Sequence, residues 1–133
     1  MSAEAFYDTN VILYLLSADA AKADRAEALL AGGGRVSVQV LNELASVASR
    51  RLGMSWKEIG EFLATVRAAC AVESIGIETH ERGLTLASRH GLNVYDAMIV
   101  ASALLADCTV LYSEDMHDGQ VFERQLTIRN PFK

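Results

Sequence analysis

The chain has 133 residues, 51% of them hydrophobic and only one of them proline, which excludes a long disordered segment and allows one domain with one ordinary core. Seventeen Asp and Glu against twelve Lys and Arg give a net charge of −5, so the chain as a whole repels nucleic acid at long range. We therefore expect a single domain over residues 1–133, in which a local feature would have to attract any polyanion.

The sequence gives no sign of a membrane segment or of an oxidising compartment. No run reaches the roughly 18 apolar residues of a membrane span, and the acid Glu4 stands where a secretory leader would carry basic residues. Cys70 and Cys108 are isolated, have apolar neighbours and lack metal-ligand spacing, so they are expected to be reduced core thiols. A cytoplasmic protein with no membrane contact is the expectation.

The first half of the chain alternates apolar runs with helical patterns. "AEAFY" predicts a short buried strand, Asp8 follows it, and a helix begins at Thr9 or Asn10 and runs through "VILYLL". An amphipathic helix over 20–31 ends at three glycines, and "RVSV" is a second strand. "VLNELASVASRRLG" is typical of another helix, which ends at Gly53.

The second half continues the alternation. Ser55 and Glu58 form a capping-box pattern that opens a helix reaching towards Cys70, and "AVESIGI" predicts a third strand. Helices follow over 78–90 and 94–108, then a fourth strand in "TVLYS" and an edge strand in "QLTIRNPF" that ends at Pro131. We expect an α/β fold in which a parallel sheet of four to five short strands has helices on both faces.

Four acids are expected to meet at one edge of this sheet. Asp8 and Asp115 each follow a predicted strand, and the carboxyl ends of parallel strands share an edge. Asp96 opens the helix that leads into the fourth strand, and Glu43 lies near the start of the helix after "RVSV". The topology therefore predicts a common acidic site.

Carboxylates gathered in this way require compensation. Two ionised carboxylates about 5 Å apart repel by roughly 3 kcal/mol at an effective dielectric constant of about 20. The cluster must take up protons at raised pKa or hold a cation, and oxygen ligands favour Mg²⁺ or Mn²⁺. We favour the metal.

Each acid also has a simpler explanation when it is taken alone. Asp8 fits a helix N-cap, and Asp96 in a first helical turn fits an interaction with the helix dipole. Glu43 fits a solvated helix face, and the acids near Gly119, Asp115 among them, fit a polar turn. Only their joint placement favours a site.

Four segments carry a resemblance to a known family. "FYDTNVILYLL", "VSVQVLNELASV", "GLNVYDAMIVASALLADC" and "LYSEDMHDGQVF" are similar, in order and separation, to the motifs of PIN-domain ribonucleases, especially the VapC-like toxins of type II toxin–antitoxin pairs. The resemblance covers essentially the whole chain. It implies a three-layer α/β/α fold and a Mg²⁺- or Mn²⁺-dependent endoribonuclease acting on single-stranded or structured RNA.

The resemblance also implies residue roles. The four acids, Asp8, Glu43, Asp96 and Asp115, would be the catalytic residues and metal ligands, with Glu43 either holding a second ion or orienting water. Asn10 and Ser113 match residues that orient ligands or water, and Asp118 is a further acid that could support a ligand. The implied partners are RNA, a cognate antitoxin that places a basic side chain among the acids, and a second copy in a homodimer.

Other polar and aromatic residues are weaker candidates for the functional site. Arg50 and Arg51 could contact RNA phosphates, although such arginines are commonly solvated. The histidines at 80, 90 and 117 are expected at the surface. Tyr7, Tyr14, Tyr95 and Trp56 are spaced as core or interface residues rather than as a surface for stacking bases.

Two rival functions remain open at this point. A phosphatase of the haloacid-dehalogenase type also places an aspartate after its first strand, where Asp8 would be a covalent nucleophile, but such sites usually carry a second aspartate at the position of Asn10. A non-catalytic PIN-like module that binds RNA or protein is the other alternative.

Overall fold

The computed structural model describes residues 5–133, in which short strands alternate with helices. The first half comprises β1 (Ala5–Tyr7), α1 (Thr9–Leu13), the 3₁₀ turn η2 (Tyr14–Leu16), α2 (Ala20–Ala31), β2 (Arg35–Ser37) and α3 (Val38–Arg50). The second half comprises α4 (Trp56–Ala69), β3 (Ala71–Glu73), α5 (Ile77–His90), α6 (Val94–Leu105), β4 (Val110–Tyr112), β5 (Val121–Phe122) and β6 (Leu126–Arg129). Ala3 and Glu4, at the start of the predicted first strand, lie outside the described residues.

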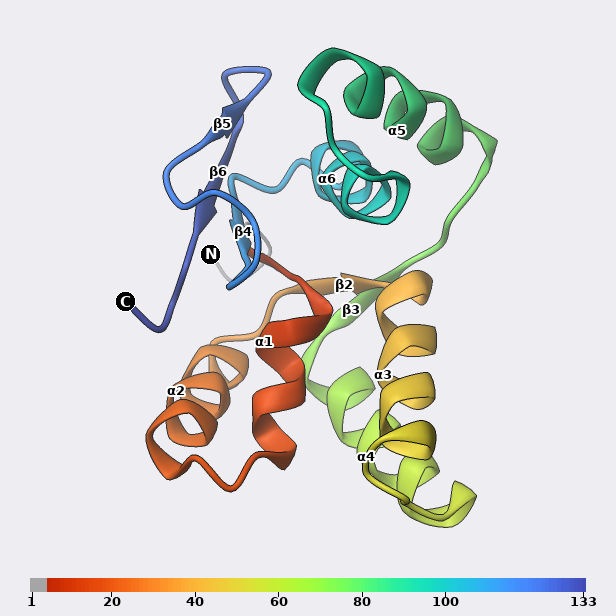
Figure 1. The fold of residues 1–133 in the computed structure, drawn as a ribbon, viewed down its shortest axis with the longest axis vertical. Coiled ribbons are helices and arrows are strands. Elements are labelled where there is room, and N and C mark those ends of the chain that lie inside the picture. Colours follow the sequence, from red (N-terminus) through yellow and green to blue (C-terminus); the bar gives the residue numbers. More distant parts are fainter. Residues whose placement is uncertain (1–4) are drawn as a thin grey trace.

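The strands form one sheet in the order β3-β2-β1-β4-β6-β5. Every neighbouring pair is parallel except β5 and β6, which are antiparallel. Helices α1 to α4 lie on one side of the sheet, and α5 and α6 lie on the other (Figure 1). The predicted α/β class with its three layers and mostly parallel sheet is confirmed.

The sheet differs from the prediction at its ends. It has six strands rather than four to five, because the two-residue strand β5 was not predicted. The segment "QLTIRNPF" was expected at the edge, but β6 lies between β4 and β5. The third strand is also shorter than "AVESIGI" suggested, since β3 ends at Glu73 and α5 begins at Ile77. Strands of two or three residues carry too little alternation to be bounded by pattern alone.

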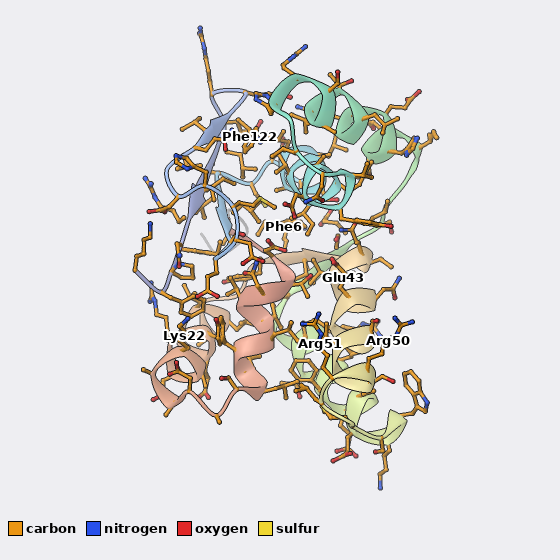
Figure 2. All side chains as sticks on the ribbon, viewed as in Figure 1. Phe6, Lys22, Glu43, Arg50, Arg51 and Phe122 are labelled. Carbon is orange, nitrogen blue, oxygen red and sulfur yellow. The ribbon has the colours of Figure 1, made fainter. Side chains whose placement is uncertain are left out.

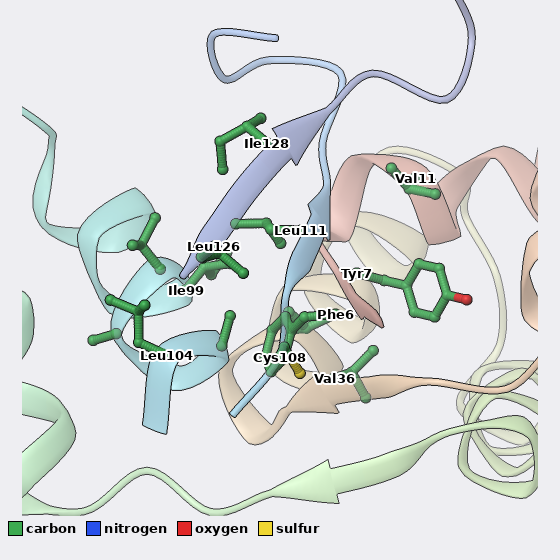
Figure 3. Close-up of a cluster of buried hydrophobic side chains, with 14 of the residues drawn as sticks. Phe6, Tyr7, Val11, Val36, Ile99, Leu104, Cys108, Leu111, Leu126 and Ile128 are labelled. Carbon is green, nitrogen blue, oxygen red and sulfur yellow. The ribbon is translucent and has the colours of Figure 1, made fainter. Parts of the chain in front are cut away.

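The central strand β1 sends successive side chains to opposite faces of the sheet, as the pleat requires. Phe6 and Tyr7 are both buried, and Figure 3 shows Tyr7 directed towards α1 and away from the cluster around Leu104. The Tyr7 hydroxyl donates to the carbonyls of Leu29, at 2.9 Å, and Gly33, at 2.6 Å. These bonds fix the end of α2 against the sheet.

Helix α6 is the central helix on the face of the sheet opposite α1 (Figure 1). Residues 97–104 of this helix are all buried and all but Ser102 are apolar, as expected for a segment covered by both sheet and helix. Gly83 of α5 lies so close to Met98 that a Cβ there would come within 2.6 Å of the Met98 Sδ. The absence of a side chain at Gly83 therefore allows α5 to pack closely on α6.

Several local predictions are confirmed. Ser55 and Glu58 form the capping box of α4, with both reciprocal bonds present. Cys70 and Cys108 are buried thiols, and burial raises the pKa of each to about 11. In residues 5–133, no helix combines the length and apolar character that crossing a bilayer would need.

Candidate active site

Asp8 follows the central strand and is held by three neighbours. Tyr7 pairs with Tyr112 in the β1–β4 register, so Asp8 comes to lie beside Ser113. The Ser113 hydroxyl donates to Asp8 Oδ2 at 2.8 Å, and the Asn10 amide donates to the same oxygen at 3.2 Å. The other oxygen accepts the backbone N–H of Thr9 at 2.7 Å, so Asp8 is also the N-cap of α1.

The Asp8 carboxyl group is 5% exposed, which changes its acidity. The pKa of Asp8 is raised to about 6, mainly because burial deprives the charged form of hydration and to a lesser extent because of the negative charges of Asp96 and Glu43. The hydrogen bonds from Ser113 and Thr9 act in the opposite direction. A carboxyl group with a pKa raised in this way is a common feature of functional sites.

Glu43 reaches the same region from α3. Ser37 is the last residue of β2 and caps α3 through a bond to the Val40 N–H, so the helix starts at the edge of the sheet where β1 ends. The Glu43 Oε1 accepts a hydrogen bond from the Thr9 hydroxyl at 3.0 Å and one from the Gln39 amide at 3.3 Å. Glu43 is half-buried and therefore does not lie on a fully solvated helix face.

Asp96 occupies the first turn of α6. Asn93 caps that helix by accepting the Asp96 N–H at 2.9 Å, and its amide donates to Asp96 Oδ2, also at 2.9 Å. The pKa of Asp96 is raised, first by burial and then by the charge of Asp115, while the bond from Asn93 lowers it. Asp96 is therefore oriented by its own helix cap.

Asp115 is exposed and lies in the loop after β4, which several bonds hold in place. The Asn10 side chain accepts the Glu114 N–H at 3.0 Å, and the Ser113 hydroxyl accepts the Met116 N–H at 3.2 Å. The Glu114 carboxylate also accepts bonds from the side chains of Tyr14 and Lys22. Asn10 and Ser113 therefore fasten both Asp8 and the loop that carries Asp115.

The four predicted acids line one open cavity of about 310 Å³. Its wall also contains other polar groups, apolar groups and one cation; the lining consists of Asp8, Thr9, Asn10, Leu13, Glu43, Arg51, Asp96, Ile99 and Asp115. The structure therefore brings together the acids that the sequence places on four separate elements. None of them lies on another side of the molecule.

The donor set of this cavity suits a hard divalent cation. The available ligands are carboxylate oxygens, and Mg²⁺ is commonly bound through one or two carboxylates while it keeps several waters. Among residues 5–133, no three or more His, Cys, Asp or Glu side chains are arranged so that they could hold a metal ion by themselves. Waters or substrate oxygens would therefore have to complete the coordination of any ion bound there.

Comparison with known proteins identifies the family of this fold. The model of the PIN domain family matches residues 5–118. The chain belongs to the PIN domain family. No curated protein sequence matches this PIN domain.

Two solved structures share the fold of this PIN domain. A toxin–antitoxin complex from Klebsiella pneumoniae has a TM-score of 0.72 and 20% identity, with 96% of this chain and 97% of that chain covered. The sarcin–ricin loop cleaving toxin VapC20 of Mycobacterium tuberculosis has a TM-score of 0.68 and 24% identity, with 84% and 89% covered. At such identities the likeness concerns the fold.

Some residues named from the sequence do not reach the cavity of this PIN domain. The Asp118 carboxylate accepts the Asn130 N–H at 2.9 Å and does not line the cavity. Arg51 lines the cavity, whereas Arg50 does not, and Figure 2 shows Arg51 between α1 and α3 with Arg50 on the far side of α3. The three histidines are exposed, as expected.

Three polar residues of the site were not identified from the sequence: Thr9, Gln39 and Asn93. Signals for two of them were present. Gln39 stands one helical turn before Glu43, and Asn93 stands three residues before Asp96 in a capping pattern. Thr9 contacts Glu43, which lies 34 residues further along the chain, and no local sequence pattern predicts such a contact.

Proposed function

We propose that this PIN domain is a Mg²⁺- or Mn²⁺-dependent endoribonuclease, the toxin of a toxin–antitoxin pair. The observation that carries the proposal is the convergence of Asp8, Glu43, Asp96 and Asp115 on one cavity. The raised pKa of Asp8 indicates a carboxylate in need of a positive charge. The toxins among the solved structures support the biological role.

The ion would lie among Asp8, Asp96 and Asp115, which would bind it directly or through water, and Asn10, Ser113 and Asn93 would keep two of these carboxylates in place. A divalent ion bound there would supply positive charge to the phosphate oxygens and help water to lose a proton near neutral pH. Asp8 is buried and doubly anchored, so it would be the fixed ligand, while the exposed Asp115 would complete the site from its loop.

Glu43 would have a role of its own in the cavity. The bonds from Thr9 and Gln39 both go to its Oε1, so neither occupies its second oxygen. That oxygen would orient the attacking water or bind a second ion. Because water attacks the phosphorus and the ribose 2′-hydroxyl does not, the products would carry no 2′,3′-cyclic phosphate.

An antitoxin and a second copy of the chain would be the protein partners. The cavity is negative and open, so a basic side chain of an antitoxin could occupy it and block the acids. A neighbouring reading frame that encodes a small DNA-binding antitoxin would support this assignment, and copurification of the two proteins would test it. Light scattering would test the homodimer.

The catalytic proposal predicts which changes abolish RNA cleavage and which leave it intact. Wild-type protein with Mg²⁺ or Mn²⁺ should cleave a single-stranded oligoribonucleotide, and EDTA should abolish cleavage. Asp8→Asn and Asp96→Asn should each lower kcat/KM by about 100-fold or more, since each removes a charge needed by the ion. Asp24→Asn, an exposed change on α2, is the matched control and should leave the rate unchanged.

Circular dichroism of each variant would show whether the fold is intact. Equal cleavage by wild-type protein and the Asp8 variant, or products that end in a cyclic phosphate, would contradict the proposal. Tight RNA binding without cleavage in either metal would instead support a non-catalytic module.

A further inference from the structure

A second and larger pocket adjoins the acidic cavity. It measures about 560 Å³ and is formed where α3, the segment after β3 and the start of α6 meet. Its apolar wall consists of Val38, Ile75 and Tyr95, and its polar groups come from Gln39, Asn42 and Ser46. We refer to it as the side pocket. Glu43 lines both the side pocket and the acidic cavity, so the two share a wall.

Tyr95 is the most conspicuous group of the side pocket. Its side chain is 68% exposed although it directly precedes Asp96 in the first turn of α6. The Tyr95 carbonyl accepts a hydrogen bond from the Gln39 amide at 3.1 Å, and the same amide contacts Glu43 Oε1 at 3.3 Å. The backbone at Tyr95 is therefore tied through Gln39 to Glu43 and directly precedes Asp96, so its ring projects beside two of the acids.

We propose that the side pocket binds one unpaired nucleobase of the RNA, adjacent to the phosphate held by the acids, with the Tyr95 ring as its stacking surface. The inference rests on the proposed ribonuclease function. The exposure of Tyr95 contradicts the expectation that it is a core residue, and an exposed ring next to an acidic cavity suits a stacked base. Stacking accepts any base, since every base has a π-face.

The chemistry of the pocket favours a base over a second protein surface. Small-ligand pockets are mostly apolar with a few convergent polar groups, and the side pocket combines apolar walls with two amides and one hydroxyl. Such groups can bond to the edges of a base that has been splayed out of a single strand. The cores of protein interfaces are depleted of charge, whereas the Glu43 carboxylate forms part of this wall.

The test compares Tyr95 variants on matched substrates. The cut site of a single-stranded oligoribonucleotide is mapped first, and the base on each side of the cut is then removed in turn to give abasic substrates. Tyr95→Ala should lower kcat/KM on the intact RNA by about 10- to 100-fold, mainly through KM, in line with the energy of one stacked base. Tyr95→Phe should stay within about threefold of wild type.

On the abasic substrate that lacks the stacked base, Tyr95→Ala and wild-type protein should cleave at similar rates. Trp56→Ala is the matched control, because Trp56 is 73% exposed and lines neither pocket, and it should behave as wild type on every substrate. An equal loss for Tyr95→Ala on intact and abasic RNA would overturn the inference, as would no loss at all. Conversion of a dimer into a monomer by Tyr95→Ala, with cleavage per chain unchanged, would overturn it too and assign the surface to a second copy.

A binding measurement separates this inference from the proposed activity. In the Asp8→Asn variant, an oligoribonucleotide carrying 2-aminopurine should lose fluorescence on binding when that base enters the side pocket, and adding Tyr95→Ala should abolish the quenching. Quenching that depends on Tyr95 without any cleavage by wild-type protein would refute the nuclease and leave the base-binding pocket standing. Cleavage by wild-type protein, together with quenching that is the same with and without the Tyr95 side chain, would refute only the base-binding role of the side pocket.

Discussion

At the scale of single residues, Asp8 combines two roles that its sequence position suggests separately. It caps α1 through the Thr9 N–H, and it is also the most buried acid of the cavity. The cap therefore does not compete with the site but orients the carboxylate within it. Asp96 shows the same combination, because its place in the first turn of α6 also directs it into the cavity.

The raised pKa of Asp8 predicts a pH-dependent stability in metal-free protein. The folded carboxyl group, with a pKa of about 6 against an ordinary value of 3.8, binds its proton more tightly than the unfolded one. Stability should therefore rise as the pH falls through 6, and above that pH the buried charge costs up to about 3 kcal/mol. Asp8→Asn should stabilise the protein by about 1–2 kcal/mol near pH 8 in EDTA, because the lost acceptor offsets part of the gain.

Urea unfolding across this pH range would measure the effect, and the advantage of Asp8→Asn should shrink towards about pH 4. Asp24→Asn, on the exposed face of α2, should show no such trend. A variant that is less stable than wild type by a constant amount at every pH would show that the Asp8 charge is not the cause.

At the scale of elements, the acids meet because strands and helices join abruptly. Asp8 lies between β1 and α1, and Ser37 ends β2 directly before the helix that carries Glu43. These junctions could be predicted, because a polar residue after an apolar run marks both a strand end and a helix cap. The order of the last strands could not be predicted. The turn between β5 and β6 has Glu123 and Arg124 at positive φ, and without a glycine there the sequence does not indicate such a turn.

The turn between α2 and β2 has a strict requirement at Gly34. Its φ is +139°, and a Cβ there would lie 2.4 Å from Tyr7 Cε2. The Tyr7 ring cannot move aside easily, because its hydroxyl is bonded to the Leu29 and Gly33 carbonyls. We therefore expect Gly34→Ala to lower the free energy of unfolding by about 2–4 kcal/mol.

Gly32→Ala is the matched control two positions earlier. Gly32 has a right-handed helical conformation, and an added Cβ would meet only the Leu29 carbonyl at 3.4 Å, an ordinary contact. Its effect should stay within about 0.5 kcal/mol. Similar denaturation midpoints for the two variants would show that the turn tolerates a side chain at Gly34.

At the scale of the whole molecule, charge sets a condition on any RNA complex. The net charge of −5 opposes binding, so the acids must first be neutralised and a local cation must face the phosphates. Sequence reasoning could not choose between Arg50 and Arg51, which are adjacent at the end of α3. The structure distinguishes the two arginines, because Arg51 lines the cavity and Arg50 does not.

Arg51→Ala should therefore weaken RNA cleavage, raising KM by about 5- to 20-fold at low salt through loss of one charge-assisted phosphate contact. It should also reduce the salt dependence of binding, by a slope of about 0.7 for a single strand. Arg50→Ala is the matched control and should change neither quantity. Steady-state kinetics at several salt concentrations would measure both, and equal effects of the two variants would point to net charge alone.

The whole fold could be predicted in outline, and the four acids by residue, because both follow from alternation and from the edge shared by parallel strands. The contacts that hold the acids in place could not be predicted from the sequence. Thr9 to Glu43 and Ser113 to Asp8 join positions 34 and 105 residues apart, and their geometry depends on the packing of the whole sheet. The side pocket was missed for the same reason, since the exposure of Tyr95 depends on how α6 lies against α3.

The pairing of β4 with β6 has a consequence for biosynthesis. Asp115 follows β4, and β4 lies between β1 and a strand that comes from residues 126–129. A chain made only as far as residue 125 would hold the early acids, yet it would lack one neighbour of the strand that presents the final one. The loop that carries Asp115 would thus take its final position only after residues 126–129 have joined the sheet.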